Sequence, residues 1–153
     1  ANEAEHKDYA PLFDDVAPRI RAGISFLREK GAKEIVIVAH SLGAAMASYY
    51  LAGGPPDVAA LVGIGMSGGE DDSRMDNVVA LVKVRVPVLD LYGQNDLDDV
   101  VITAADRAKA AAGNPAFSQV QVPEADHFFD GQEAALQEVV AGWLDETVPP
   151  TAE

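Results

Sequence analysis

Residues 39–43 read Ala-His-Ser-Leu-Gly, and they have the composition of a turn that presents a serine for nucleophilic attack. The apolar run Ile-Val-Ile-Val at 35–38 precedes them. A strand that turns sharply into a helix leaves no room for large side chains on either side of the serine, and Ala39 and Gly43 are small. The spacing therefore predicts that the hydroxyl of Ser41 is exposed at the end of a strand, where it could attack a carbonyl carbon.

A base and an acid that could activate this serine follow later in the chain. A serine hydroxyl is a weak nucleophile until a base accepts its proton. His127 follows the predicted strand 117–122 through a short polar segment, and an imidazole suits proton transfer near neutral pH. Asp96 follows the apolar run 87–92 and could hold the His127 ring in orientation. All three residues lie just past predicted strands, which favours acyl transfer through an acyl-enzyme.

Other carboxylates compete with Asp96 for the role of the acid: Asp98, Asp99, Asp71 and Asp72. Asp98 and Asp99 follow Asp96 closely in the sequence, but Asp99 is better placed to cap the predicted helix 99–112. Asp71 and Asp72 follow the second predicted strand and are the weaker alternatives.

The nucleophile and the base also have plain structural interpretations. Ser41 could simply cap the helix that begins at Leu42, and His127 could be an exposed loop histidine. The preceding strand, the small neighbours and the two phenylalanines after His127 favour the chemical interpretation. His40 is predicted to point away from the nucleophile in a structural role, and His6 is given no role.

This arrangement resembles the α/β-hydrolase superfamily, especially its esterase and lipase-like members. The order Ser, acid, His is that of the superfamily, and residues 93–96 (Gly-Gln-Asn-Asp) match its Gly-x-x-Asp pattern. Ala39 departs from the usual first glycine of the serine motif. The resemblance covers nearly the whole chain but only the second half of the usual fold, and it implies a triad of Ser41, Asp96 and His127.

The resemblance also implies how the oxyanion is bound. One donor would be the backbone N–H of Leu42, at the positive end of its helix. The superfamily's second donor comes from a loop after an early strand, and this chain lacks that segment. A substitute could come from the loop 65–69, from Gln94 or Asn95, or from a partner chain. Loss of one donor typically costs about 10²–10³ in turnover, so a slow enzyme is expected.

Alternating apolar runs and amphipathic segments predict an α/β fold, with residues 1–153 as a single domain. The expected strands are 34–39, 58–64, 86–92 and 117–122. The expected helices are 12–30, 42–52, a short one around 74–82, 99–112 and 131–146. This alternation predicts a parallel sheet of about four strands flanked by helices on both faces, a minimal or partial α/β-hydrolase fold. Residues 1–10 and 148–153 are expected to be loose tails.

The first predicted strand would be an edge strand, because the earlier strands of the full hydrolase pattern are missing. Its residues from Ile35 to Val38 include no charge or proline that would discourage pairing. We expect this edge to be covered, either by the same strand of a two-fold partner in a homodimer or by the N-terminal half of a larger enzyme of which this chain is a fragment.

Composition narrows the possible partners. The net charge of −14 disfavours nucleic acid and anionic membranes, and no stretch has the length of a membrane span. There is no cysteine, and the three histidines lack the spacing of a metal site, so no metal or cofactor is expected. The sequence carries no signal that assigns a compartment.

Together these features predict a small serine hydrolase, most simply a carboxylesterase. The loop 68–72 is too short to form the lid that relatives insert there, so the site should be open and suited to small short-acyl esters. A thioesterase or an amidase would use the same triad. The alternative is a hydrolase-derived module or fragment with little activity, whose sheet edge serves binding or assembly.

Overall fold

The computed structural model describes residues 9–54 and 57–149. Its strands are β1 (Val36–His40), β2 (Ala60–Ile64), β3 (Val88–Asn95) and β4 (Phe117–Asp126). They form one parallel sheet in the order β1-β2-β3-β4, so each strand pairs with its neighbours in the chain. This confirms the predicted parallel sheet of about four strands.

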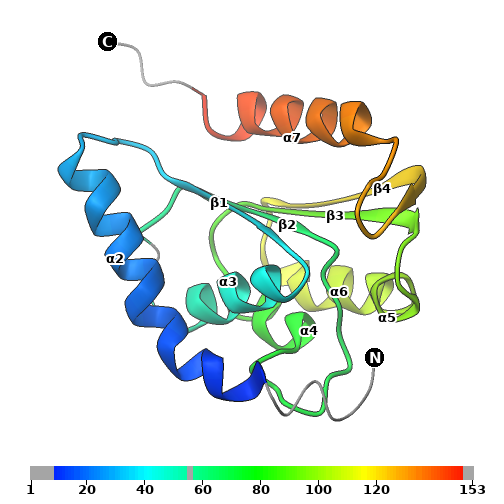
Figure 1. The fold of residues 1–153 in the computed structure, drawn as a ribbon, viewed down its shortest axis with the longest axis horizontal. Coiled ribbons are helices and arrows are strands. Elements are labelled where there is room, and N and C mark those ends of the chain that lie inside the picture. The colour runs from blue at the N-terminus through cyan, green and yellow to red at the C-terminus, as the bar shows by residue number, and fades with distance from the viewer. Residues whose placement is uncertain (1–8, 55–56, 150–153) are drawn as a thin grey trace.

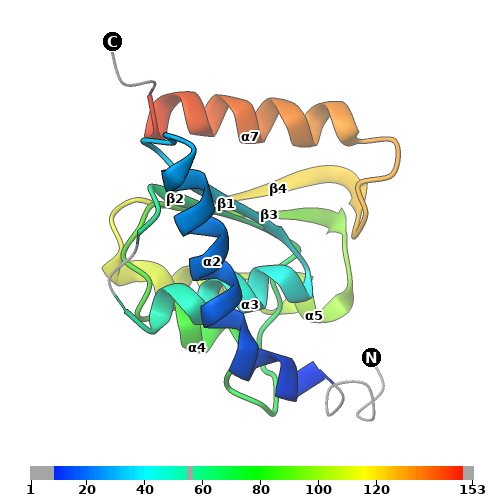
Figure 2. The same cartoon turned by 60° about the vertical axis from the view of Figure 1, so that its left-hand side comes forward.

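Helices cover both faces of the sheet, as predicted. Helix α7 (Glu133–Thr147) lies along one face. On the other face lie α2 (Val16–Glu29), α3 (Leu42–Ala52), α4 (Asn77–Leu81), α5 (Asp98–Ile102) and α6 (Ala104–Ala110). Figure 1 and Figure 2 show this three-layer arrangement, with α2 crossing the outer side of α3. Short 3₁₀ segments, η1 (Ala10–Asp15) and η2 (Ala111–Gly113), precede α2 and follow α6.

The hydrophobic core lies on both sides of β2, whose five residues are all buried. Successive side chains of a strand point to opposite faces, so Leu61 packs with Ala44 and Leu51 of α3 while Val62 packs on the α7 side. The predicted apolar face of the last helix is confirmed in contact with this second cluster: Leu136, Val139, Val140, Trp143 and Leu144.

Strands β3 and β4 extend further than predicted. The expected polar loop at 123–127 is wrong, because β4 continues to Asp126 and pairs with Asn95 at the end of β3. Pro123 is tolerated because β4 is an edge strand, where its missing N–H breaks no ladder. Gly93 allows the close approach, since a Cβ there would lie 2.3 Å from the carbonyl oxygen of Ala125.

Two predicted helices are interrupted. The predicted helix 12–30 begins as η1 and continues as α2, and Pro18 lies in the first turn of α2 as expected. The predicted helix 99–112 is split into α5, α6 and η2. Asp99 lies in the first turn of α5 and does not cap it, because Leu97 occupies the cap position. The hydroxyl of Thr103 donates to the carbonyl oxygen of Asp99, a side-chain bond that accompanies the break.

Two residues that were predicted to lie in the loose tails instead belong to helix ends. Ala10 lies within η1, and the backbone N–H of Val148 donates to the carbonyl oxygen of Leu144 at the end of α7. The rest of the predicted tails, residues 1–8 and 150–153, lies outside the described residues. Within the described part of the chain, no helix is long and apolar enough to cross a bilayer.

Strand β1 lies at the edge of the sheet, as expected, and pairs with β2 on one side. Val38 on this strand is 56% exposed. The pairing of this edge with a second copy, or with a missing half of a larger enzyme, stays a prediction.

Candidate active site

Ser41 occupies a sharp turn between β1 and α3. Its backbone has φ 55° and ψ −126°, a conformation that is strained for a residue with a Cβ. The Ser41 N–H donates to the carbonyl oxygen of Ile64 at 2.8 Å, which fixes the turn to the end of β2. The side chain makes no capping hydrogen bond to α3, so the interpretation of Ser41 as a helix cap is wrong. The strained turn instead frees the hydroxyl for other contacts.

The structure brings Ser41, His127 and Asp96 together. His127 Nε2 lies 3.0 Å from Ser41 Oγ, and His127 Nδ1 lies 2.6 Å from Asp96 Oδ1. The Asp96 side chain is fully buried and that of His127 is 9% exposed. With Nδ1–H donating to Asp96, the Nε2 lone pair can accept the Ser41 proton.

Parallel strands explain why residues so far apart in sequence meet. Ser41 directly follows β1, Asp96 follows β3 and His127 follows β4. Because the carboxyl ends of parallel strands share one edge of the sheet, the three side chains reach the same place.

Backbone donors fix the Asp96 carboxylate. Its Oδ2 accepts from the N–H of Gly93 at 3.1 Å, and its Oδ1 accepts from the N–H of Leu97 at 2.8 Å. Gly93 lies in β3 and Leu97 directly follows Asp96, so the end of this strand holds the carboxylate in one orientation.

The rival carboxylates are placed elsewhere. Asp72 forms an ion pair with Arg74 at 2.7 Å, and the hydrogen bond from Arg74 lowers the pKa of Asp72 below its ordinary value. Asp98 and Asp99 are exposed in the first turn of α5, and Asp71 is exposed in the loop after β2. Of the candidates, Asp96 is the one that binds His127 Nδ1.

His40 has a more specific place than the sequence predicted. Its Nε2 lies 2.8 Å from the backbone oxygen of His127, and the two rings are 4.6 Å apart. His40 therefore contacts both the backbone and the ring of His127. The phenylalanines after His127 separate: Phe129 is buried under α7, whereas Phe128 is 71% exposed and meets the His127 ring edge-on. His6 lies outside the described residues.

Gly65, which directly follows β2, touches the other side of His127. Its φ is +62°, and a Cβ added there would lie 2.9 Å from His127 Cε1. No local pattern in the sequence indicates this contact, because it depends on the packing of β2 against the turn after β4. Gly65 thus leaves the space that the imidazole fills.

Replacing Gly65 by alanine is expected to displace His127 and to lower kcat about 10²-fold, the loss typical of a misplacement near 1 Å. Gly69→Ala is the matched control, since Gly69 has φ +76° and no atom within 4 Å of an added Cβ. Both variants should lose about 1–2 kcal/mol of folding free energy from backbone strain. Equal activity of the two variants, measured alongside thermal unfolding, would contradict a steric role for Gly65.

Some of the predicted oxyanion donors already have hydrogen-bond partners in the structure. Leu42 is the first residue of α3, so its N–H has no partner within the helix. Several predicted sources of the second donor are already engaged: the N–H of Gly65 by Leu91, the N–H of Gly69 by Asp76, and the Asn95 amide by the backbone oxygen of Glu124. The side-chain oxygen Oε1 of Gln94 accepts from the backbone N–H of Glu124, which holds the Gln94 side chain against β4. Ser67, from the predicted loop 65–69, lines the same pocket as Ser41, and its hydroxyl donates to Glu70 Oε1 at 3.2 Å.

A pocket of about 200 Å³ opens at Ser41. Its lining residues are Tyr9, Ser41, Leu42, Ala45, Gly65, Ser67, Glu70, Met75, Leu97, Asp99, Val100 and His127. Ala45, Met75 and Val100 make a buried apolar surface within it. A larger hollow of about 540 Å³ lies between α2, α3 and α4, but none of Ser41, Asp96 and His127 lines it.

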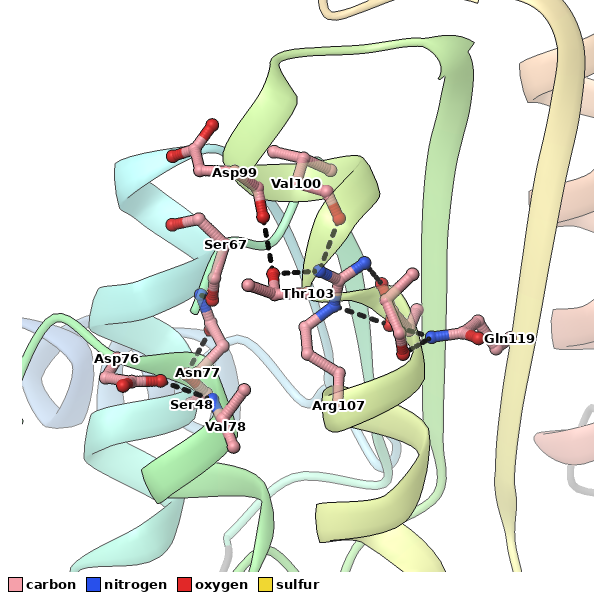
Figure 3. A network of polar contacts seen from close by, with 12 residues as sticks. Ser48, Ser67, Asp76, Asn77, Val78, Asp99, Val100, Thr103, Arg107 and Gln119 are labelled. Atoms are coloured by element: carbon pink, nitrogen blue, oxygen red, sulfur yellow. Dashed lines mark hydrogen bonds and ion pairs between the residues drawn. The ribbon is translucent and has the colours of Figure 1, made fainter. Parts of the chain in front are cut away.

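A buried polar network supports one wall of the pocket at Ser41 (Figure 3). Asn77, which is fully buried, donates through Nδ2 to the carbonyl oxygen of Ser67 at 3.0 Å, and Ser48 Oγ donates to Asn77 Oδ1 at 2.7 Å. Asp76 caps α4 by accepting from the N–H of Val78 and also accepts from the N–H of Gly69. The loop after β2 is thereby held against α3 and α4.

A model of the family described as "Protein of unknown function (DUF3530)" matches residues 2–146. No curated protein matches the chain. Solved structures do match, at low identity. An α/β-hydrolase enzyme from the metagenome of lagoon sediments at Mar Chica, Morocco, is 20% identical, with a TM-score of 0.66 over 86% of this chain and 70% of that one.

Two further structures are similar. An esterase domain from Rhodothermus marinus is 22% identical, with a TM-score of 0.66 over 84% of this chain and 68% of that one. A dienelactone hydrolase from Anabaena variabilis is 21% identical, with a TM-score of 0.66 over 96% of this chain and 69% of that one. In other matches the chain spans as little as 58% of the solved chain. These similarities confirm the predicted α/β-hydrolase fold.

Proposed function

We propose that this chain, which belongs to the DUF3530 family of proteins of unknown function, is a serine hydrolase that acts on small short-acyl carboxylic esters. The observation that carries the proposal is the continuous chain of hydrogen bonds from Ser41 Oγ through His127 to the buried Asp96. The esterases among proteins of similar fold support the choice of substrate class.

The geometry supports a two-step reaction. Ser41 Oγ would attack the carbonyl carbon while its proton passes to His127 Nε2, and Asp96 would stabilise the imidazolium that forms. Collapse of the tetrahedral intermediate would break the ester C–O bond, and His127 would return the proton to the departing alcohol. Water would then attack the acyl-enzyme with His127 again as the base, which releases the carboxylic acid and restores Ser41.

Charge on the oxyanion would be held first by the N–H of Leu42, at the N-terminus of the eleven-residue helix α3. Ser67 lines the same pocket, but its hydroxyl donates to Glu70 Oε1 at 3.2 Å, so it could assist only by exchanging that hydrogen bond for one to the substrate. A site with a single donor would be about 10²–10³ slower than one with two.

The size of the pocket supports a short acyl group. At about 200 Å³ the pocket is below the roughly 300–1,000 Å³ typical of sites for drug-sized ligands. Its apolar residues Ala45, Met75 and Val100 suit an alkyl chain. Thioesters and amides fit the same chemistry. Esters are chosen over amides because an alcohol leaves more readily than an amine, and over thioesters because of the esterases among proteins of similar fold.

A fluorophosphonate probe tests the proposal directly. We expect one covalent adduct per chain, located by mass spectrometry on the peptide that contains Ser41, together with loss of p-nitrophenyl acetate hydrolysis. His127→Ala should abolish the labelling, because the hydroxyl then has no base. Labelling at another residue, or an active preparation that the probe leaves unlabelled, would reject Ser41 as the nucleophile and favour the alternative of a binding module.

A further inference from the structure

The side chain of Arg107 is fully buried between α6, α5 and the sheet (Figure 3). Its Nε donates to Asp90 Oδ2 at 2.8 Å, and its Nη2 approaches Asp90 Oδ1 at 3.4 Å. Asp90 lies in the middle of β3 and is also fully buried. The guanidinium thus anchors α6 to the strand whose far end leads into Asp96.

The same guanidinium also reaches α5. Its Nη1 donates to the carbonyl oxygen of Val100 at 2.8 Å and to Thr103 Oγ1 at 3.0 Å. Val100 lies in the last turn of α5, which ends at Ile102, so its carbonyl oxygen has no hydrogen-bond donor within this helix. Arg107 supplies the missing donor and joins α5, through its own side chain, to Asp90.

Helix α5 and the residue before it form one wall of the serine pocket. Leu97, Asp99 and Val100 all line the pocket, and Val100 is 1% exposed. Helix α5 has only five residues, so its own hydrogen bonds hold it weakly. The position of this wall therefore depends on what fixes the short helix to the sheet.

A contribution to folding stability does not by itself account for the buried ion pair between Arg107 and Asp90. Removing two charges from water is expensive, and well-packed apolar residues often replace a buried pair without loss of stability. Burial raises the pKa of Asp90 despite the attraction of Arg107, which reflects that cost. Gln119 completes the network by donating to Asp90 Oδ2 and to the carbonyl oxygen of Ala104, both at 2.8 Å.

We propose that Arg107 is a positioning residue that clamps the α5 wall of the pocket to β3 and thereby limits the length of the acyl chain that the site accepts. The proposal rests on the proposed function, because it concerns the selectivity of that same site. A fork-shaped guanidinium can serve Asp90 and the Val100 carbonyl together, whereas a lysine ammonium at the end of a flexible chain cannot match that geometry.

The test is Arg107→Lys, which keeps the positive charge beside Asp90 and removes the fork. The control is Arg85→Lys, because Arg85 is exposed and donates to the carbonyl oxygens of Val82 and Val84, away from the pocket. We expect the ratio of kcat/KM for p-nitrophenyl hexanoate over p-nitrophenyl acetate to rise roughly tenfold in Arg107→Lys, the effect of about one methylene in a pocket. The ratio for Arg85→Lys should match that of the parent protein.

Hydrogen–deuterium exchange provides a readout that does not depend on catalysis. Amides of α5 should exchange about tenfold faster in Arg107→Lys than in the parent, while those of α3 keep their protection. Unchanged exchange in α5 would overturn the clamp even if the protein hydrolyses esters. Faster exchange with no hydrolysis by the parent protein would retain the clamp and reject the proposed function instead.

A paired variant covers the case in which Arg107→Lys does not fold. Asp90→Leu with Arg107→Met replaces both charges with apolar groups and leaves Gln119 its bond to Ala104. We expect this variant to fold, to show fast exchange in α5 and to have the same rise in the hexanoate-to-acetate ratio. A folded variant with the parent's ratio would show that Arg107 is only structural.

Discussion

Replacing Ser41 by alanine is expected to lower kcat for p-nitrophenyl acetate by about 10⁴–10⁶-fold, as for other serine nucleophiles. The fold should survive, because the Ser41 side chain is hydrogen-bonded to His127 and does not cap the backbone of α3. Steady-state kinetics and thermal unfolding of the purified variant measure the two effects. Retention of more than a tenth of the parent rate would place the reaction on another residue.

Ser41→Gly serves as the companion variant for the strained turn. Glycine also lacks the nucleophile, but it adopts the positive φ of this position without the steric cost that a Cβ imposes. We expect it to be as inactive as Ser41→Ala and more stable than that variant by about 1 kcal/mol. Such a gain would show that the turn stores strain in order to present the hydroxyl, and equal stability of the two variants would contradict this.

Replacing Asp96 by asparagine is expected to lower kcat by about 10⁴-fold, because the amide favours the wrong tautomer of His127. One carboxylate oxygen accepts from Leu97 and faces His127, and the other accepts from Gly93. The NH₂ of asparagine must therefore replace an acceptor and face a donor, whichever way it is turned. A loss of about 1–3 kcal/mol in unfolding free energy should accompany the kinetic effect.

Asp98→Asn is the matched control for this second prediction. Asp98 carries the same charge two residues further on, but it is exposed in the first turn of α5 and does not line the pocket. Its kcat and unfolding midpoint should stay close to those of the parent. If both substitutions reduced kcat alike, the effect would come from net charge and not from orientation of the imidazole.

The proposed clamp by Arg107 would connect two parts of the site to one strand. The N–H of Gly93 in β3 holds the Asp96 carboxylate, and Arg107 connects the α5 wall to Asp90 of the same strand. Asp96 and the pocket wall would then keep fixed positions relative to each other. A substrate held by that wall would meet the reacting groups at a set distance, which is how positioning contributes to rate.

The sequence alone determined which residues could react and that a strand precedes each of them. The small residues around Ser41 and the strand-like segments before Asp96 and His127 are local signals. Parallel strands bring such ends to one edge by topology alone, and the distances of 3.0 Å from Ser41 to His127 and 2.6 Å from His127 to Asp96 agree with that expectation.

Only the tertiary structure decided what surrounds those residues. The extension of β4 to Asp126, the break at Thr103, the space that Gly65 leaves for His127 and the burial of Arg107 against Asp90 all depend on contacts between distant segments. No local periodicity encodes them, because the free energy that fixes each one comes from pairing or packing with a partner far away in the chain.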